Sequence, residues 1–235
     1  MPVFKLSEEL VFPSPELARD DGILAIEGDL SPDRILLAYS NGIFPWYSKG
    51  QPIIWWCPDP RFVLFPKKIT ISHSLKKGIK RNKFKITYDK DFRSVITGCQ
   101  QSPRRNQSGT WITDEMLEAY CKLHTVGYAH SVEAWYDGNL AGGFYGVSLG
   151  RCFMGESMFT KVPNASKVAF ATLTGDLIKN QFIVVDSQVY TDHMSNFGAE
   201  NISRSEYLKI LYEALEYETI VGNWNEKLRN NNLNI

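Results

Sequence analysis

The stretch that most constrains this chain is a set of three consecutive strand patterns near its middle. His130 to Tyr136 and Leu140 to Ser148 read as two strands joined by Asp137-Gly138. This dipeptide favours a type I′ turn, because both central residues of that turn need positive φ. Arg151 to Phe159 continues as a third strand. The pattern predicts an antiparallel meander against which the remaining elements must pack.

Helix patterns precede and follow this meander. We expect helices over 32–41 after the cap Ser31, over 72–79 after Ser72, around 92–99, and from the cap Thr113 to about Gly127. Beyond the meander we expect a helix from the cap Asn164 to Lys179, a buried strand over 182–186 and a last helix opened by a capping box at 203–206. This order predicts an α+β fold with a mixed sheet.

The first sixty residues have a different character. They contain one short helix pattern and are rich in Pro and Trp, especially over 42–47 and 53–61. This aromatic density fits a small domain packed around tryptophans, and it also fits the wall of a pocket. Strands and helices of normal length begin after Arg61, so we predict a small N-terminal domain over 1–62 and a larger domain over 63–235.

Several classes of protein are disfavoured by composition. No apolar run approaches the roughly 20 residues that cross a bilayer, and the N-terminus lacks the pattern of a secretory signal. We therefore expect a cytoplasmic protein without a membrane partner. The 4 cysteines and 4 histidines show no metal-ligand spacing. We accordingly expect reduced thiols and no bound metal.

The charge of the chain is unevenly distributed. The formal net charge is +0, yet no acidic residue lies between Arg61 and Asp89. In the helix expected there, Leu75 and Ile79 face inward. This leaves Lys76, Lys77 and Lys80 pointing outward, and Arg81 and Lys83 continue the same basic run. We call these five residues the basic set. The set is either a solvated helix face or a nucleic-acid contact.

The chain shows no phosphate-binding loop, dinucleotide fingerprint or hydrolase serine elbow, so any group it transfers must arrive already activated. One stretch that could contribute to a catalytic site is Gly155 to Phe159, where Glu156 interrupts an apolar strand. Glu156 either faces water on an edge strand or is a buried carboxylate that receives a substrate amine or orients other groups.

A second stretch lies at the end of the expected buried strand. Asp186 and Gln188 stand at i and i+2, where side chains of a strand project to the same face, so they could act together. The alternative is a strand end capped by polar residues. His193, shortly after, is either part of a polar loop or a base with a pKa near neutrality.

Taken together, these motifs resemble the leucyl/phenylalanyl-tRNA-protein transferases from about Phe12 to about Leu208. The matching segments are Phe12–Pro15, Gly28–Pro32, Asn41–Trp46, Trp55–Arg61, Gly109–Thr113, His130–Glu133, Gly142–Val147, Gly155–Phe159, Asn164–Lys167 and Asp186–Val189. Any one of them alone is weak, but their number and order make the resemblance specific.

The resemblance implies a small N-terminal domain and a GNAT-like catalytic domain with a mixed sheet flanked by helices. It also implies a reaction in which the α-amino group of an N-terminal Arg or Lys attacks the ester of Leu-tRNA or Phe-tRNA, with Met a further candidate donor. The product would be a degradation signal of the N-end rule. The ester carries its own activation, so no cofactor is expected.

The same resemblance assigns roles to residues. Asp186 and Gln188 would be the catalytic pair, with Gln188 chiefly orienting the amine and Asp186 supporting it. The aminoacyl end would be surrounded by Trp111, Tyr120, Phe144, Phe153, Glu156, Met158 and Phe170. The basic set would contact the phosphates of the tRNA acceptor stem.

Two other functions compete with this one. An acyl-CoA-dependent GNAT N-acetyltransferase would need a pyrophosphate-cradling [QR]-x-x-G-x-[GA] turn, which the sequence lacks. A non-catalytic RNA-binding protein is supported only by the basic set and the aromatics. We expect a monomer.

Overall fold

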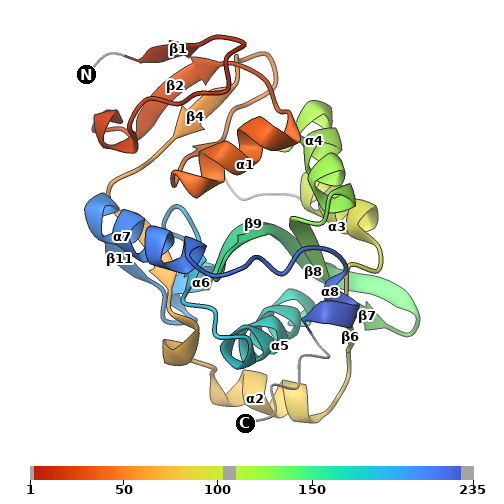
Figure 1. Ribbon diagram of the computed structural model, residues 1–235. Coiled ribbons are helices and arrows are strands. Elements are labelled where there is room, and N and C mark those ends of the chain that lie inside the picture. Colours follow the sequence, from red (N-terminus) through yellow and green to blue (C-terminus); the bar gives the residue numbers. More distant parts are fainter. Residues whose placement is uncertain (1–2, 103–109, 229–235) are drawn as a thin grey trace.

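A computed structural model describes residues 3–102 and 110–228 of the chain, and in this part helices cover both faces of a large sheet beside a smaller sheet (Figure 1). Gly109 of the motif Gly109–Thr113 lies outside the described residues. The small sheet has the order β1-β2-β4-β3. Its strands are β1 (Phe4–Leu6), β2 (Ile23–Glu27), β3 (Phe44–Pro45) and β4 (Ile54–Trp56), accompanied by η1 (Pro15–Leu17) and α1 (Pro32–Ser40).

The large sheet begins after the small one ends and has the order β11-β5-β10-β9-β8-β7-β6. Its strands are β5 (Arg61–Leu64), β6 (Lys85–Tyr88), β7 (Ala129–Tyr136), β8 (Asn139–Leu149), β9 (Cys152–Thr160), β10 (Val184–Asp186) and β11 (Glu200–Ile202). Only β9 and β10 pair in parallel within this described sheet. The expected mixed sheet and meander are confirmed, and Asp137 and Gly138 both have positive φ.

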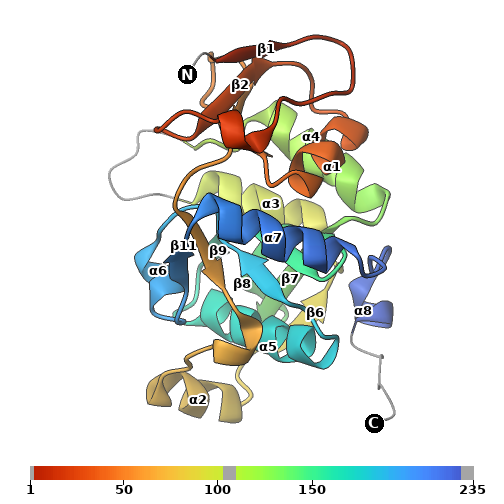
Figure 2. The same ribbon diagram turned by 60° about the vertical axis from the view of Figure 1, so that its left-hand side comes forward.

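Two helical layers enclose the large sheet. The helices after β5 are η2 (Pro66–Lys68), α2 (His73–Lys80), α3 (Phe92–Gln101), α4 (Asp114–Thr125), α5 (Ala165–Lys179), α6 (Asp192–Ser195), α7 (Arg204–Leu215) and α8 (Trp224–Lys227). Figure 2 shows α3 and α7 on one face and α5 on the other. Successive side chains of β8 point to opposite faces of the sheet and so pack against both helical layers. Phe144 packs in the core on the α5 side, and Tyr145 packs in the core on the α3 side.

The helix starts show which local predictions hold. Ser31, Ser72, Thr113 and Ser203 each accept a bond from a backbone N–H of the first turn, as the capping patterns predict. Asn164 is different: it precedes α5 in the left-handed conformation, with φ 71°, and makes no capping bond with its side chain. The predicted start of this helix is therefore correct, but the prediction that the Asn164 side chain caps it is wrong. An asparagine tolerates this conformation better than most residues do.

Among the described residues, the small sheet shares one of the two hydrophobic cores of the large sheet. Trp55 of β4 and Tyr39 of α1 belong to the same buried cluster as Tyr120 of α4 and Tyr207 of α7. The small N-terminal part thus packs directly on the helices above the large sheet. A division of the chain at residue 62 remains a prediction, although the change from one sheet to the other falls between Trp56 and Arg61.

Candidate active site

The parallel strands β9 and β10 separate at one end and a cavity opens there. Their pairing ends at Asp186 opposite Met154, while β9 continues to Thr160. The cavity has a volume of about 550 Å³. Its wall includes most of the residues that the sequence predicted for catalysis and aminoacyl binding, namely Trp111, Phe144, Phe153, Glu156, Met158, Phe170, Asp186 and Gln188. The predicted Tyr120 lies behind this wall and reaches it through Glu156.

Glu156 enters the cavity through an irregularity of the sheet. Tyr145 pairs with Ser157 and Gly146 with Gly155, so Glu156 is the extra residue of a β-bulge. Bulges re-aim side chains, and they are common beside active sites. Here the carboxylate of Glu156 points to α1 and α4. Tyr39 Oη donates to Glu156 Oε1 over 2.6 Å, and Tyr120 Oη donates to Oε2 over 3.1 Å. Glu156 is therefore partly buried on an interior strand and bonded to two tyrosines, rather than on a water-facing edge.

This carboxyl group is set up to hold a proton near neutral pH. Burial raises the pKa of Glu156 to about 7, although bonds from Tyr39 and Tyr120 act in the opposite direction. The two phenol oxygens also lie 2.6 Å from each other. Two phenolic protons thus serve three oxygen–oxygen contacts. A proton on Glu156 would complete the ring of hydrogen bonds.

Gln188, two residues beyond the end of β10, is bonded to Glu156 of β9. Its side-chain Nε2 donates to Glu156 Oε1 over 2.9 Å, which leaves the amide carbonyl oxygen as an acceptor. Strand β10 ends at Asp186, and Gln188 has φ 57°. The same-face argument from strand alternation is therefore wrong for this pair. Gln188 meets Asp186 through its backbone N–H, which donates to Asp186 Oδ1 over 2.9 Å.

Asp186 forms a buried ion pair with Arg61. Arg61 donates from Nε to Oδ1 over 2.8 Å and from Nη2 to Oδ2 over 2.6 Å, and both side chains are at most 1% exposed. Tyr207 Oη adds a bond to Oδ2 over 2.9 Å. Burial alone lowers the pKa of Arg61, but the charge of Asp186 outweighs it and holds the pKa above its ordinary value. The guanidinium is charged at every pH of interest.

Sequence reasoning missed three of these residues. Tyr39 lies in the helix expected over 32–41; its ring is buried like a core residue, yet its hydroxyl bonds Glu156. The available signal was that a buried tyrosine needs a partner for its hydroxyl. Arg61 and Tyr207 gave no local signal, because they bond Asp186 from far away in the sequence. Arg61 lies 125 residues from Asp186 and Tyr207 lies 21 residues from it. Both interpretations of the N-terminal aromatics hold, since Trp55 is core and Trp46 lines the cavity.

His193 also lines the cavity, from α6. Burial, and then the charge of Lys167, lower the pKa of its imidazole below the ordinary value. The ring is therefore neutral at neutral pH. Its Nε2 is buried and has no hydrogen-bond partner among the described residues. Its edge packs against Phe197.

A wider groove adjoins the cavity. It has a volume of about 1150 Å³, and Trp46 and Trp111 line both spaces. Asp114 and Glu115, in the first turn of α4, contribute acidic side chains to its wall. The basic set lies elsewhere, on and just after α2. All five of its side chains, Lys76, Lys77, Lys80, Arg81 and Lys83, are exposed.

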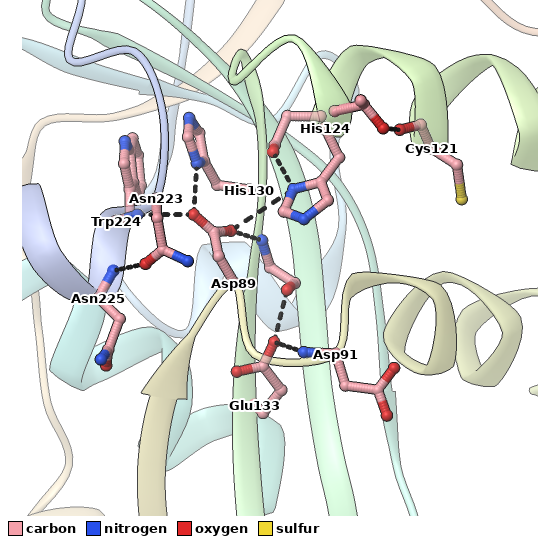
Figure 3. A network of polar contacts seen from close by, with 12 residues as sticks. Asp89, Asp91, Cys121, His124, His130, Glu133, Asn223, Trp224 and Asn225 are labelled. Atoms are coloured by element: carbon pink, nitrogen blue, oxygen red, sulfur yellow. Dashed lines mark hydrogen bonds and ion pairs between the residues drawn. The ribbon is translucent and has the colours of Figure 1, made fainter.

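A second buried polar network lies around Asp89, at the end of β6 (Figure 3). The Asp89 carboxylate accepts bonds from Ser131 N over 2.9 Å and Trp224 N over 2.8 Å, and it lies 2.9 Å from His130 Nδ1. The His130 ring stacks on Trp224, with centroids 3.9 Å apart. Burial lowers the pKa of His130 despite the bond to Asp89. We call these four residues the Asp89 network.

Two features are absent from the described ranges, 3–102 and 110–228. In these ranges no three His, Cys, Asp or Glu side chains gather as they would around a metal ion. None of the helices there combines the length and the apolar character that a bilayer crossing requires.

Comparison with known proteins gives consistent matches over nearly the whole chain. Residues 63–212 match the family described as leucyl/phenylalanyl-tRNA protein transferase, and residues 28–59 match its N-terminal domain. Curated proteins named leucyl/phenylalanyl-tRNA–protein transferase are similar. The protein of Desulforapulum autotrophicum is 54% identical over 95% of this chain and 98% of its own length, and that of Myxococcus xanthus is 52% identical over 96% and 97%.

A solved structure, that of L-PGS from Bacillus licheniformis, gives a much weaker match. It aligns with a TM-score of 0.38 at 10% identity, and covers 73% of this chain and 57% of its own. This likeness is too low to bear on function.

Proposed function

The chain belongs to the leucyl/phenylalanyl-tRNA protein transferase family, and we propose that it joins Leu or Phe to the N-terminal Arg or Lys of a protein in the cavity between β9 and β10. The family is one of aminoacyltransferases that take their donor group from tRNA and give it to a protein. This membership sets aside the acetyltransferase and the non-catalytic alternatives. Such a product marks a protein for degradation under the N-end rule.

The walls of the cavity suit the proposed donors. Met158 is partly exposed in the cavity wall, and Phe144, Phe153 and Phe170 lie almost fully buried in it. A Leu or Phe side chain would therefore meet an apolar wall in which a flexible Met adapts to either shape. A volume of about 550 Å³ lies within the usual range for small-molecule sites. The same apolar surface would admit Met and disfavour polar side chains.

The proposed chemistry uses the bond between Gln188 and Glu156. The acceptor amine must lose a proton before it attacks the ester carbonyl carbon. Glu156, with a pKa of about 7, takes that proton, and the carbonyl oxygen of Gln188 accepts an N–H of the amine and aims it. The new C–N bond forms as the bond to the ribose 3′-oxygen breaks. The leaving oxygen recovers a proton from the amine, directly or through the neighbouring 2′-hydroxyl.

The groove beside the cavity gives the acceptor a route of approach. Its acidic side chains Asp114 and Glu115 complement a basic N-terminal residue, and Trp46 and Trp56 offer faces to a cation. The basic set on α2 would contact the tRNA acceptor stem through phosphates, without sequence choice. Charged tRNA is used in the cytoplasm, so we propose that location, with the protein acting as a monomer.

The observation that carries the proposal is a glutamine amide bonded to a carboxylate of raised pKa, at the open end of the only parallel strand pair in the described part of the large sheet. The test supplies radiolabelled Leu-tRNA with a peptide that begins with Arg and with one that begins with Ala. We expect label only in the Arg peptide, and a loss of about 100-fold in Gln188→Ala. Full turnover by Gln188→Ala with both substrates bound would contradict the assignment.

A further inference from the structure

Asp186 has no acceptor capacity left for a substrate. A carboxylate offers about four lone-pair sites. Oδ1 accepts from Arg61 Nε over 2.8 Å and from Gln188 N over 2.9 Å. Oδ2 accepts from Arg61 Nη2 over 2.6 Å and from Tyr207 Oη over 2.9 Å. The group is 0% exposed, so it can act on the reaction only through the residues it holds.

Arg61 is the centre of this arrangement. Its third nitrogen, Nη1, donates to the carbonyl oxygen of Gly42, just after α1, over 3.1 Å. The planar guanidinium lies between two aromatic rings, 4.9 Å from the centroid of Phe44 and 4.4 Å from that of Tyr207. Arg61 therefore ties the N-terminal part, the large sheet and α7 together at one point, in a slot that fits a flat cation.

Gln188 depends on this arrangement for its backbone conformation. Its φ of 57° is disfavoured for a residue with a side chain, so surrounding bonds must maintain it. The N–H of Gln188 is held by Asp186, and its carbonyl oxygen accepts from the backbone N–H of Phe62, the residue after Arg61, over 3.3 Å. Both peptide groups of Gln188 are thus fixed by Arg61 or its neighbours.

We propose that Arg61 is a positioning residue for aminoacyl transfer: it fixes Asp186, and Asp186 holds Gln188 in the conformation that aims the acceptor amine. The inference rests on the proposed function, in which Gln188 touches the substrate. Arg61 itself touches neither substrate. Its loss should lower the rate of the bound complex rather than the affinity for either substrate.

Arg34 provides a matched control within the same chain. It is also fully buried, and it pairs with Asp29 over 2.9 Å and donates to the carbonyl oxygen of Ser7 over 3.0 Å. It lines neither the cavity nor the groove. Asp29 is half-exposed whereas Asp186 is fully buried, so Arg34→Ala controls for the loss of a buried arginine but not for the unpairing of a buried carboxylate.

The experiment compares Arg61→Ala and Arg34→Ala in the full chain, with thermal unfolding, binding of Leu-tRNA and single-turnover transfer measured with and without millimolar guanidinium ion. We expect Arg61→Ala to lose about 100-fold in rate, with Leu-tRNA affinity unchanged. Guanidinium should refill the slot and restore at least part of the rate. Arg34→Ala should keep its rate and show no rescue.

Three results would overturn the inference: a folded Arg61→Ala with full rate, a loss confined to affinity, or no rescue of a folded variant. If Arg61→Ala does not fold, Arg61→Lys decides, because it keeps the charge but loses the two-pronged contact. We expect Arg61→Lys to lose about tenfold in rate, and a full rate would refute the role. Gln188→Ala run in parallel separates the two hypotheses: its full activity would sink the proposed function, whereas its inactivity beside fully active Arg61 variants would sink only this inference.

Discussion

The cavity and the Asp89 network bury similar side chains and differ in what can reach them. His130 lies 2.9 Å from Asp89, which looks more like a familiar catalytic pair than Gln188 beside Glu156 does. Yet no residue of the Asp89 network lines the cavity or the groove, whereas Glu156 and Gln188 both line the cavity. Access to a substrate, rather than residue type, is the basis on which we propose a reactive role for Glu156 and Gln188 and a structural role for the Asp89 network.

The two regions also differ in how completely their carboxylates are satisfied. Asp89 accepts two backbone N–H groups and faces an imidazole, and His124 lies 3.8 Å away as a further neighbour. These bonds fasten α8 to the edge strand β6 and to its neighbour β7. Glu156 is held only by side-chain hydroxyls and an amide, and its pKa is raised. The first network should serve stability and the second should serve chemistry at some cost in stability.

The largest expected effect is on the rate of Glu156→Gln. We expect single-turnover transfer to fall about 100- to 1000-fold, because a neutral amide of the same shape cannot take the proton of the amine. The matched control is Glu133→Gln. Glu133 is fully buried and bonded to Thr87 and Ser131 beside the Asp89 network, away from the cavity. Equal losses of rate in the two variants would contradict the proposal that the carboxylate in the cavity, unlike the one beside the Asp89 network, takes part in the reaction.

Asp89→Ala should have the opposite profile. Removing the carboxylate leaves the N–H groups of Ser131 and Trp224 and the ring of His130 without their partner, so we expect a loss of about 3 to 5 kcal/mol in the free energy of unfolding. Urea unfolding measures the loss. The transfer rate per folded molecule should stay within twofold of the wild type, and a large drop would assign the network a role in catalysis.

The dependence of stability on pH gives a third way to separate the regions. Glu156 has a folded pKa of about 7 against an ordinary value of 4.5, so the folded chain keeps a proton that the unfolded chain releases between these values. Stability from this group is therefore full below about pH 4.5 and decreases as pH rises to about 7. The free energy of unfolding of the wild type, minus that of Glu156→Gln, should fall by about 3 kcal/mol across this window. A flat difference would mean that folding does not raise the pKa of Glu156.

Much of this arrangement was predictable from local sequence patterns. The Asp137-Gly138 turn and the caps Ser31, Ser72 and Thr113 are as expected, because each depends on neighbours within a few residues. The buried strand expected over 182–186 is also present, although it begins at Val184. The α+β class followed from their order. Family resemblance then placed nearly all the predicted aminoacyl contacts on one cavity.

What the sequence could not predict depends on contacts between distant segments. No periodicity reveals that Glu156 is the extra residue of a bulge, because the bulge is defined by the register of β8 against β9. Likewise Tyr39 meets Glu156 only after α1 packs on the helices above the large sheet. The positive φ of Gln188 also follows from tertiary bonds, which overrode the extended geometry assumed for a strand end.

A smaller effect is expected when one bond to Glu156 is removed. Tyr39→Phe deletes a hydroxyl that bonds the carboxylate over 2.6 Å and keeps the buried ring. A bond to a charged group contributes about 1.5 kcal/mol, so the transfer rate should fall about tenfold. Tyr88→Phe is the control, since Tyr88 Oη bonds the Asp176 carboxylate away from the cavity. If Tyr88→Phe slowed transfer equally, the loss of rate in Tyr39→Phe could not be assigned to its bond with Glu156.

The smallest effect concerns the molecular surface, away from both the cavity and the Asp89 network. Lys76→Ala on α2 should weaken Leu-tRNA binding a few-fold and reduce the slope of log affinity against log salt by about 0.9, because one phosphate contact releases about one counterion. Lys5→Ala is the control, since Lys5 is exposed on β1 at the opposite end of the molecule from α2 (Figure 1). The rate at saturating tRNA should be unchanged in both variants. A phosphate contact holds the substrate without touching the reacting atoms, so a fall in saturated rate for Lys76→Ala would show that α2 also aligns the ester in the cavity.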